Sequence, residues 1–409
     1  MVVAGKKSFV DNLIEEYHFD IKPNVRALGT RSVYYYQAEH SLLVSHILSN
    51  RVHVLNLATG KIRWFDHHGT TVRSIQMCDS EIVTASWDGK VCVTNFDTLK
   101  PRLILTEKEM GRSPDVVISP DHANLYSYSY DSDINPERKS NTVRRWKLET
   151  GELKKVLKLP GTHLSGRRCG SCVVSSNRLY VVSDSGHLHI YHSTIPVLLA
   201  EKSYNDELQS ICLSSDSRML FMGGSEGNIY QCSLSGKRIK QVYKAHRFDI
   251  TQMLIPCDKP NILITVSFDG TLKIWDVKSL ELIQTIFVQG ICLWTVTVVD
   301  NLLITGGEKG EIWIYDIQNL PEIKVKGKLF IAGDSYAYLP SDSGYFYATN
   351  LSLMQVRKNE DHSVVEGQYA EYLLNTACNF KIFKDLFSKG SSDLISLKQE
   401  SYGFYQLTQ

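Results

Sequence analysis

The sequence lacks a long hydrophobic run, an excess of either charge and any segment of low complexity. Because 45 basic residues stand against 44 acidic ones and the net charge is +1, no overall field favours nucleic acid or an anionic membrane surface. No run of about eighteen apolar residues occurs, and no apolar core stands near the N-terminus, so we expect neither a transmembrane helix nor a secretory signal. Without a linker, the composition gives no sign of two separate halves.

The cysteine pattern does not suggest a disulfide framework. The nine cysteines are odd in number and scattered, and Cys92, Cys212 and Cys232 lie inside alternating strand patterns. This usage is typical of a reducing compartment, so we expect a cytoplasmic protein, with the nucleus as the alternative.

Two short motifs resemble ligand sets without completing one. Cys169 and Cys172 have the spacing of a redox or zinc motif, but they run directly into a strand pattern and no second pair accompanies them. His187 and His189 share one face of a strand, with no third ligand near them in sequence. We therefore expect neither a metal site nor a cofactor.

What the sequence does contain is a repeat of about forty residues. Each unit has two alternating apolar runs joined by a short turn, and a glycine in that turn accepts the positive φ of a tight hairpin. Alternation of period two, with almost no helical spacing between units, predicts an all-β protein. The turn pairs are Asp88-Gly89, Ser185-Gly186, Glu226-Gly227, Asp269-Gly270 and Lys309-Gly310.

The clearest unit is residues 263–276, in which the Asp269-Gly270 turn is followed by a strand that ends in Trp275-Asp276. Ala245-His246 precedes this unit. In these residues the chain resembles the WD40 repeat family over roughly residues 25–358, with divergent repeats and one true Trp-Asp. The resemblance implies a β-propeller of four-stranded blades around a central channel. The length of the array favours eight blades, and seven blades with an added cap are the alternative.

The two ends differ from the repeats. Residues 1–24 form an N-terminal segment, in which the pattern over 8–17 predicts a short helix. In the family an N-terminal strand usually closes the ring by pairing into the last blade, and residues 19–21 or 25–28 could supply it. Residues 359–409 form a C-terminal extension. An amphipathic stripe over 366–388 predicts a helix packed on the propeller, with a docking helix for a partner as the alternative.

The resemblance also implies a hydrogen-bonded set within one repeat, here His246, Ser267, Asp269 and Trp275. In this set the carboxylate accepts from the imidazole, and the serine hydroxyl lies between the imidazole and the indole N–H. No nucleophile elbow surrounds Ser267, so we interpret the set as structural and expect no catalytic residue and no enzyme.

The position just before each turn carries the functional prediction. In a propeller these turns project from one face, where large exposed aromatics are typical of protein-binding hot spots. The alternative is that each ring folds over its own blade. A long loop at 132–140 and a basic pair in a connecting loop are expected on the same face. The predicted binding residues are Trp87, Tyr130, Phe268, Asp184, Glu308, Arg167 and Arg168.

Together these features favour a non-catalytic scaffold or adaptor that binds protein or peptide partners, as a monomeric ring within a larger complex. A propeller enzyme is one alternative, and it needs convergent acid, base or metal ligands at the channel mouth. The substrate-recognition subunit of a ubiquitin ligase is another. The basic stretch Gly236–Lys240 would support nucleic-acid binding, but most short charge runs are solvated turns, so we expect no nucleic acid.

Overall fold

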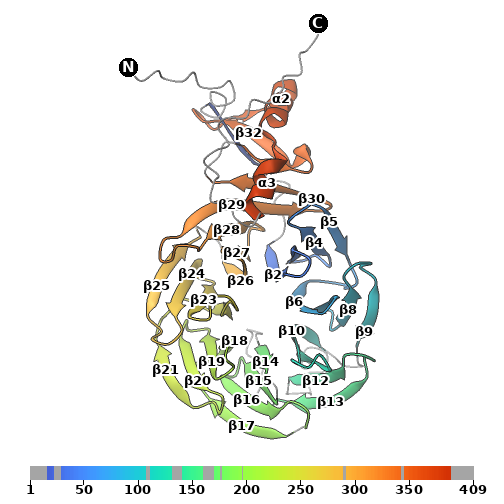
Figure 1. Ribbon diagram of the computed structural model, residues 1–409, viewed down its shortest axis with the longest axis vertical. Helices are drawn as coiled ribbons and strands as arrows, with labels where there is room; N and C mark the ends of the chain where they lie inside the picture. Colours follow the sequence, from blue (N-terminus) through green and yellow to red (C-terminus); the bar gives the residue numbers. More distant parts are fainter. Residues whose placement is uncertain are drawn as a thin grey trace.

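The computed structural model describes residues 16–22, 29–106, 111–130, 141–159, 170–175, 177–195, 197–288, 292–341 and 345–387. Within these residues the strands form eight antiparallel sheets, and most of the sheets stand around a central channel (Figure 1). The predicted all-β propeller is therefore confirmed.

Each blade is a meander of four consecutive strands whose innermost strand faces the channel. Blade 1 consists of β2 (Thr30–Tyr36), β3 (Ser41–His46), β4 (Val52–Asn56) and β5 (Ile62–Phe65). Blade 2 consists of β6 (Val72–Cys78), β7 (Glu81–Ser86), β8 (Val91–Asn95) and β9 (Pro101–Leu105). Blade 3 consists of β10 (Arg112–Ile118), β11 (Asn124–Tyr130), β12 (Thr142–Lys147) and β13 (Leu153–Lys158).

The remaining blades repeat this order. Blades 4 to 7 consist of β14 (Gly170–Val174), β15 (Arg178–Ser183), β16 (His187–His192) and β17 (Leu198–Ser203); β18 (Leu208–Leu213), β19 (Met219–Gly224), β20 (Ile229–Ser233) and β21 (Arg238–Val242); β22 (Ile250–Leu254), β23 (Ile262–Ser267), β24 (Thr271–Asp276) and β25 (Leu282–Phe287); and β26 (Leu293–Val299), β27 (Leu302–Gly307), β28 (Ile312–Asp316) and β29 (Lys324–Ala332).

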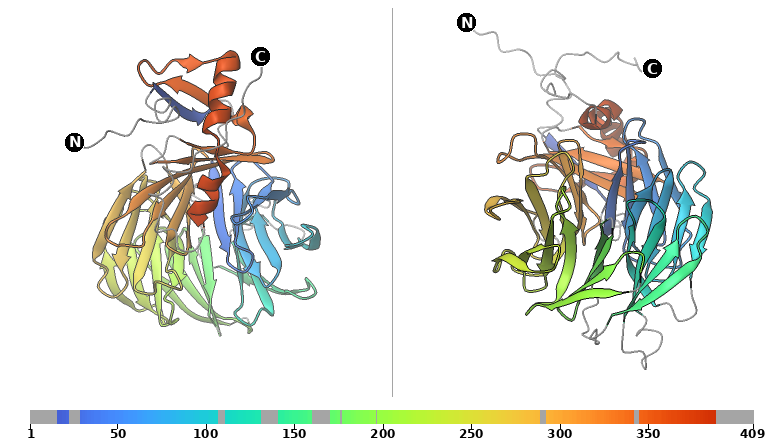
Figure 2. Two further views of the ribbon diagram at one scale, coloured as in Figure 1. Left: turned by 45° about the horizontal axis from the view of Figure 1, so that its top comes forward. Right: turned by 60° about the horizontal axis from the view of Figure 1, so that its bottom comes forward.

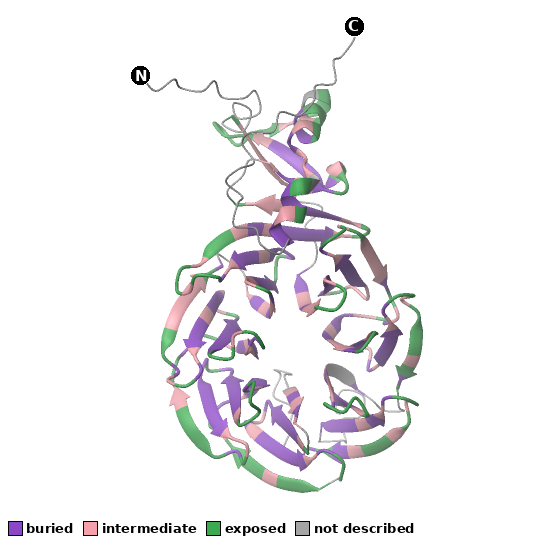
Figure 3. Cartoon of the chain, viewed as in Figure 1, coloured by how far each residue is buried: buried purple, intermediate pink, exposed green. Residues whose placement is uncertain are grey.

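The core lies between the blades, because alternating side chains of one sheet pack against those of the next. Between blades 6 and 7, for example, Val266 and Leu272 share a buried cluster with Leu293 and Leu303. Figure 3 shows buried residues along the inner strands and exposed residues along the outermost ones. The apolar alternation seen in the sequence therefore serves interfaces between blades rather than one central core.

Seven blades close the ring. The innermost strands contact one another in sequence, and β26 of blade 7 lies directly against β2 of blade 1. Thr30 Oγ1 donates to the carbonyl of Gly310 over 3.2 Å, and Thr295 Oγ1 accepts from the Val33 N–H over 3.0 Å. At this seam a Cβ on Gly29 would lie 2.6 Å from the carbonyl oxygen of Glu308, so the entry to blade 1 needs glycine. Eight sheets exist, but the ring follows the seven-blade alternative.

The eighth sheet lies beside the ring and contains the N-terminal strand. It consists of β1 (Tyr17–Ile21), β32 (Met354–Lys358) and β33 (Val364–Val365). The prediction that residues 19–21 close the ring is therefore wrong, because β1 pairs with β32 instead of with blade 7. Residues 25–28 and the predicted helix over 8–17, apart from its last two residues, lie outside the described part.

Blade 7 is longer than the others. Its sheet continues from β29 into β30 (Ser335–Pro340) and β31 (Tyr347–Ala348), so the chain covers this outer edge itself. A short 3-10 turn, η2 (Leu351–Leu353), then leads into β32. The last part of the predicted propeller, residues 354–358, thus belongs to the small sheet.

The C-terminal stripe forms two helices, α2 (Gly367–Ala377) and α3 (Phe380–Phe387), instead of one. Leu373 and Ala377 of α2 pack on the small sheet, and α3 packs where blade 7 meets blade 1. Figure 2 shows the small sheet and α2 standing away from the ring, with α3 lying against it. The expected packing on the propeller is confirmed. Among the described residues, no helix is long and apolar enough to span a bilayer.

Candidate interaction face

The turns that follow the second strand of each blade lie on one face of the ring, together with the segments that lead into each first strand. We call this the loop face. The backbone N–H of the residue after the second strand donates to that entering segment in several blades: Trp87 to Thr71 O over 3.1 Å, and Phe268 to Asp249 O over 3.1 Å. This bond holds Trp87 and Phe268 against their own blades.

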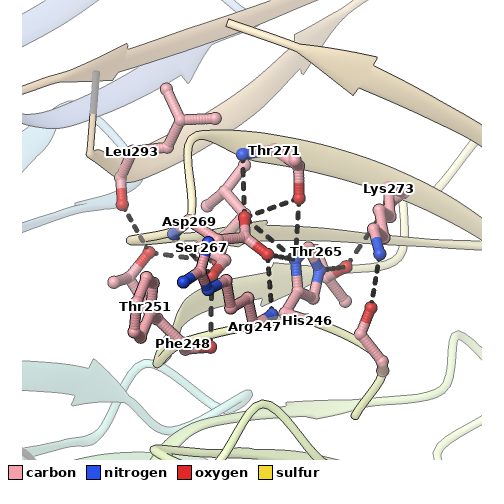
Figure 4. Close-up of polar contacts among 12 residues, drawn as sticks. His246, Arg247, Phe248, Thr251, Thr265, Ser267, Asp269, Thr271, Lys273 and Leu293 are labelled. Carbon is pink, nitrogen blue, oxygen red and sulfur yellow. Dashed lines mark hydrogen bonds and ion pairs between the residues drawn. The ribbon is translucent and has the colours of Figure 1, made fainter. Parts of the chain in front are cut away.

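Beneath the loop face of blade 6 lies the hydrogen-bonded set that the sequence predicted, with one member exchanged (Figure 4). His246 Nε2 lies 2.7 Å from Thr265 Oγ1, and the Trp275 indole N–H donates to the same oxygen over 2.9 Å. His246 Nδ1 lies 3.2 Å from an Asp269 carboxylate oxygen. The set therefore joins the turn to the third strand through a threonine.

Ser267 does not occupy the predicted position between the imidazole and the indole. Its hydroxyl donates to Phe248 O over 3.2 Å and accepts from the Asp269 N–H over 3.0 Å. Ser267 is the last residue of β23, two residues nearer the turn than Thr265. Its hydroxyl therefore contacts the backbone of the entering segment and of the turn instead of the two rings.

The electrostatics of the set are those of a neutral imidazole bonded to a carboxylate. Burial opposes ionisation of Asp269, but hydrogen bonds from His246, Thr271 and the Arg247 N–H hold the pKa of this carboxyl well below its usual range. Burial also lowers the pKa of His246. The His246 side chain is fully buried, as expected for a set that stabilises the blade.

Blade 2 contains a second set of this kind, which the sequence reading did not identify. His68 Nε2 lies 2.8 Å from Thr84 Oγ1, and its Nδ1 lies 3.3 Å from Asp88 Oδ1. Thr94 stands where blade 6 has its tryptophan. The absent tryptophan hides this set, whereas the pair His68-Gly69 before Asp88-Gly89 is the signal that could have revealed it.

The predicted loop-face residues differ in how exposed they are. Phe268 and Glu308 are exposed there, and Trp87 is half-buried with the Arg73 guanidinium 5.7 Å from its ring centre. Asp184 lies in the turn after β15 but is buried there, so it is not available to a partner as predicted. The side chain of Tyr130, together with Arg167, Arg168 and the loop 132–140, lies outside the described part.

Comparison with known proteins agrees with this geometry. The family model described as WD domain, G-beta repeat matches residues 237–276, the segment from β21 to β24 that contains His246, Asp269 and Trp275. The chain therefore contains a WD40 repeat. The other blades of the ring have the same four-stranded architecture.

Curated relatives match over part of the length of this chain. WD repeat-containing protein 18 of Rattus norvegicus is 30% identical over 105 residues, which are 23% of this chain and 24% of that protein. The Danio rerio protein of the same name is 27% identical over 169 residues, 38% of this chain and 36% of that one. Methylosome protein WDR77 of Xenopus laevis is 24% identical over 110 residues, 26% and 33% of the two chains. The matches thus span about a quarter to a third of each relative.

Further aromatic side chains lie on the loop face of blades 5 and 6. Tyr243 follows β21 and is 71% exposed, and Phe287 ends β25 and is 77% exposed. Phe248, in the segment entering blade 6, is 47% exposed and has the Arg247 guanidinium 5.3 Å from its ring centre. With Phe268, which is 37% exposed, these residues form what we call the aromatic patch. Their place at the loop-face ends of outer and entering segments can be recognised only once the strands are assigned to blades, so no local sequence pattern revealed them.

The second hydrogen-bonded set makes the stability of the ring sensitive to acid. Burial opposes ionisation of Asp88, but hydrogen bonds from His68 and from the N–H groups of Gly69 and Lys90 lower the pKa of its carboxyl to about 2. In the unfolded chain this pKa is about 3.9. Ionised Asp88 therefore stabilises the fold above about pH 4, and this contribution is lost as the pH falls from about 4 to 2.

We therefore expect Asp88→Asn to lower the free energy of unfolding by about 2 kcal/mol at neutral pH, and this difference to shrink as the pH approaches 2. Urea denaturation of both proteins across this range measures the effect. Asp66→Asn, at an exposed carboxylate close by, is the control and should change little at any pH. An Asp88→Asn difference that does not depend on pH would contradict the role of the carboxylate.

Proposed function

We propose that this protein is a non-catalytic scaffold that binds a protein partner through the loop face, with the aromatic patch as the centre of the contact. The observation that carries the proposal is the exposure of Tyr243, Phe248, Phe268 and Phe287 on one face of neighbouring blades. Aromatic side chains are enriched at interface hot spots because they bury large areas at a small cost in conformational entropy.

The rest of the structure supports this role. The patch stands on closed blades whose turns are held by buried hydrogen bonds, so its side chains are positioned before any partner arrives, which lowers the entropic cost of binding. Arg247, beside Phe248, adds a cation to the edge of the patch and favours a partner with a carboxylate next to an apolar side chain. WD40 relatives support a protein-interaction scaffold.

Membership of a larger complex is the second part of the proposal. One relative bears the name of an assembly, the methylosome, and this supports complex formation as a mode of action without indicating the same complex. We place the protein in the cytoplasm or the nucleus, because strand-core thiols such as Cys92 and Cys212 suit a reducing compartment.

The test compares two variants in the native source. Phe248→Ser with Phe268→Ser alters the patch, and Leu198→Ser with Leu199→Ser alters exposed apolar residues on the outer strand of blade 4. Proteins that purify with the wild type are identified, and the Kd of the most abundant one is measured with each purified variant. We expect the patch variant to bind at least about tenfold more weakly and the blade 4 variant within about twofold of the wild type.

Two results would overturn the proposal. One is a partner that binds the patch variant and the wild type equally well. The other is a partner lost only from the blade 4 variant, which would move the interface to the outer wall of the ring. Circular dichroism of both variants shows that any loss of binding does not come from unfolding.

A further inference from the structure

Three side chains of different chemistry meet on the face opposite the loop face. Cys78 ends β6, and Asp79 follows it in the turn between the first two strands of blade 2. His122 lies in the corresponding turn of blade 3, after β10. The residues are far apart in the sequence and are brought together because neighbouring blades place equivalent turns side by side.

Their distances are close to those of a metal site. His122 Nδ1 lies 3.2 Å from Asp79 Oδ2, and Cys78 Sγ lies 3.9 Å from the same oxygen. All three candidate ligand atoms lie within 4.8 Å of one another. In a tetrahedral zinc site, bonds of about 2.3 Å to sulfur and about 2.0–2.1 Å to nitrogen or oxygen place the ligand atoms roughly 3.3–3.6 Å apart. Zinc binding would therefore draw the Cys78 sulfur closer to the Asp79 carboxylate than it lies in the metal-free site.

We propose that Cys78, Asp79 and His122 bind a zinc ion between blades 2 and 3, with the fourth position open to water or to a group of a partner. A thiolate, an imidazole and a carboxylate are the ligands that zinc accepts together, whereas calcium and magnesium take oxygen ligands. Nothing in the sequence pattern indicates this set, and the sequence led us to expect no metal.

The surroundings of the site favour a cation. Cys78 is buried, whereas Asp79 and His122 are exposed, so the ion would lie at the surface with its sulfur ligand beneath it. The carboxylates of Asp79 and Glu81 both lie near the thiol, and the Arg102 guanidinium in this region is paired with Glu81. Zinc binding replaces the thiol proton, and the proton passes to solvent.

The competing explanation is an ordinary surface pair between His122 and Asp79, next to an uninvolved thiol. Such a pair contributes little to stability and needs no metal. The two explanations differ in whether Cys78 Sγ bonds a metal, and cobalt(II) reports this directly because a cobalt–thiolate bond gives a strong charge-transfer absorption in the near ultraviolet.

The experiment uses the full chain, freed of metal with a chelator and titrated with Co²⁺ and then with Zn²⁺. We expect about one equivalent of cobalt to produce the charge-transfer band and about one equivalent of zinc to remove it. Cys78→Ser should abolish the band, and His122→Gln should weaken cobalt binding at least about tenfold. Because His122 lies exposed in a turn, its replacement leaves the fold intact.

The chain offers matched controls. Asp300 has the same left-handed backbone as Asp79, with φ of 53° against 52°, in the equivalent turn of blade 7, so Asp300→Asn should leave cobalt binding unchanged and Asp79→Asn should weaken it. Cys257→Ser removes an exposed thiol and should keep the band. A band that is absent from the wild type, or that survives in Cys78→Ser, would overturn the proposal. Either result leaves the loop-face function untouched, because the patch lies on the other face.

Discussion

Phe383→Ala is expected to lower the free energy of unfolding by about 3–5 kcal/mol. Phe383 lies in α3 and is fully buried at the seam where blade 7 meets blade 1. Its ring centre is 5.0 Å from that of Tyr336, 5.2 Å from that of Phe387 and 6.0 Å from that of Tyr347. Alanine would leave a void beside the rings of Tyr336 and Tyr347, which are held by β30 and β31, so little collapse can fill it.

Because of its location, replacing Phe383 should weaken the contact between blades 7 and 1 as well as its own surroundings. The N-terminal strand does not pair into blade 7, so α3 is the element that covers this seam from outside, packing on Leu42 of blade 1 and Leu329 of blade 7. Urea denaturation measures the overall loss of stability, and hydrogen exchange should show faster opening of β2 and β30. Tyr372→Ala, at an exposed position on α2, is expected to stay within about 0.5 kcal/mol of the wild type. If Phe383→Ala had the same denaturation midpoint as the wild type, α3 would contribute no stability to the ring and the prediction would be wrong.

The blade architecture was predictable from the sequence because its determinants are local. The Asp269-Gly270 turn and the alternating residues on either side of it specify a hairpin by themselves, since glycine accepts a φ of 76° there. The number of blades was not predictable in this way. Residues 336–357 carry the same hairpin pattern as a blade, yet β30 and β31 extend blade 7 and β32 pairs with β1. A strand pattern does not encode its distant pairing partner.

The candidate sites show the same difference between residues set by local sequence and residues set by distant contacts. His246, Asp269 and Trp275 follow from the repeat pattern, but the hydroxyl that joins them depends on cross-strand register, because Thr265 and Ser267 point to the same face of β23. The exposure of Phe287 depends on the outer edge of blade 6, and no local pattern reveals it. The approach of Cys78 to His122 depends on packing between blades. Residues fixed by the turn and the repeat pattern were therefore accessible from the sequence, whereas those that depend on strand register, on the position of a strand in its blade or on packing between blades were not.

Thr265→Val tests the hydrogen-bonded set of blade 6 and is expected to cost about 2–6 kcal/mol of unfolding free energy. Valine has the shape of threonine but no hydroxyl, so the change leaves two buried polar atoms, His246 Nε2 and Trp275 Nε1, without their shared partner. Each such atom costs about 1–3 kcal/mol. Urea denaturation gives the total, and hydrogen exchange of the Trp275 indole N–H, which should become faster, shows where the loss arises.

Two further variants decide which hydroxyl holds the set. Thr265→Ser keeps the oxygen and should retain slow exchange of the indole N–H, so it separates the hydrogen bond from the lost methyl group. Ser267→Ala removes only contacts to the backbone of the entering segment and of the turn, and it should cost about 1 kcal/mol without affecting the indole. If Ser267→Ala instead proved the more damaging change and released the indole N–H, the serine would be the link that the repeat pattern predicts. Both residues lie on one strand of one blade, so any effect on the ring as a whole is the same for both variants. The difference between their unfolding free energies therefore measures the contribution of the hydrogen-bonded set.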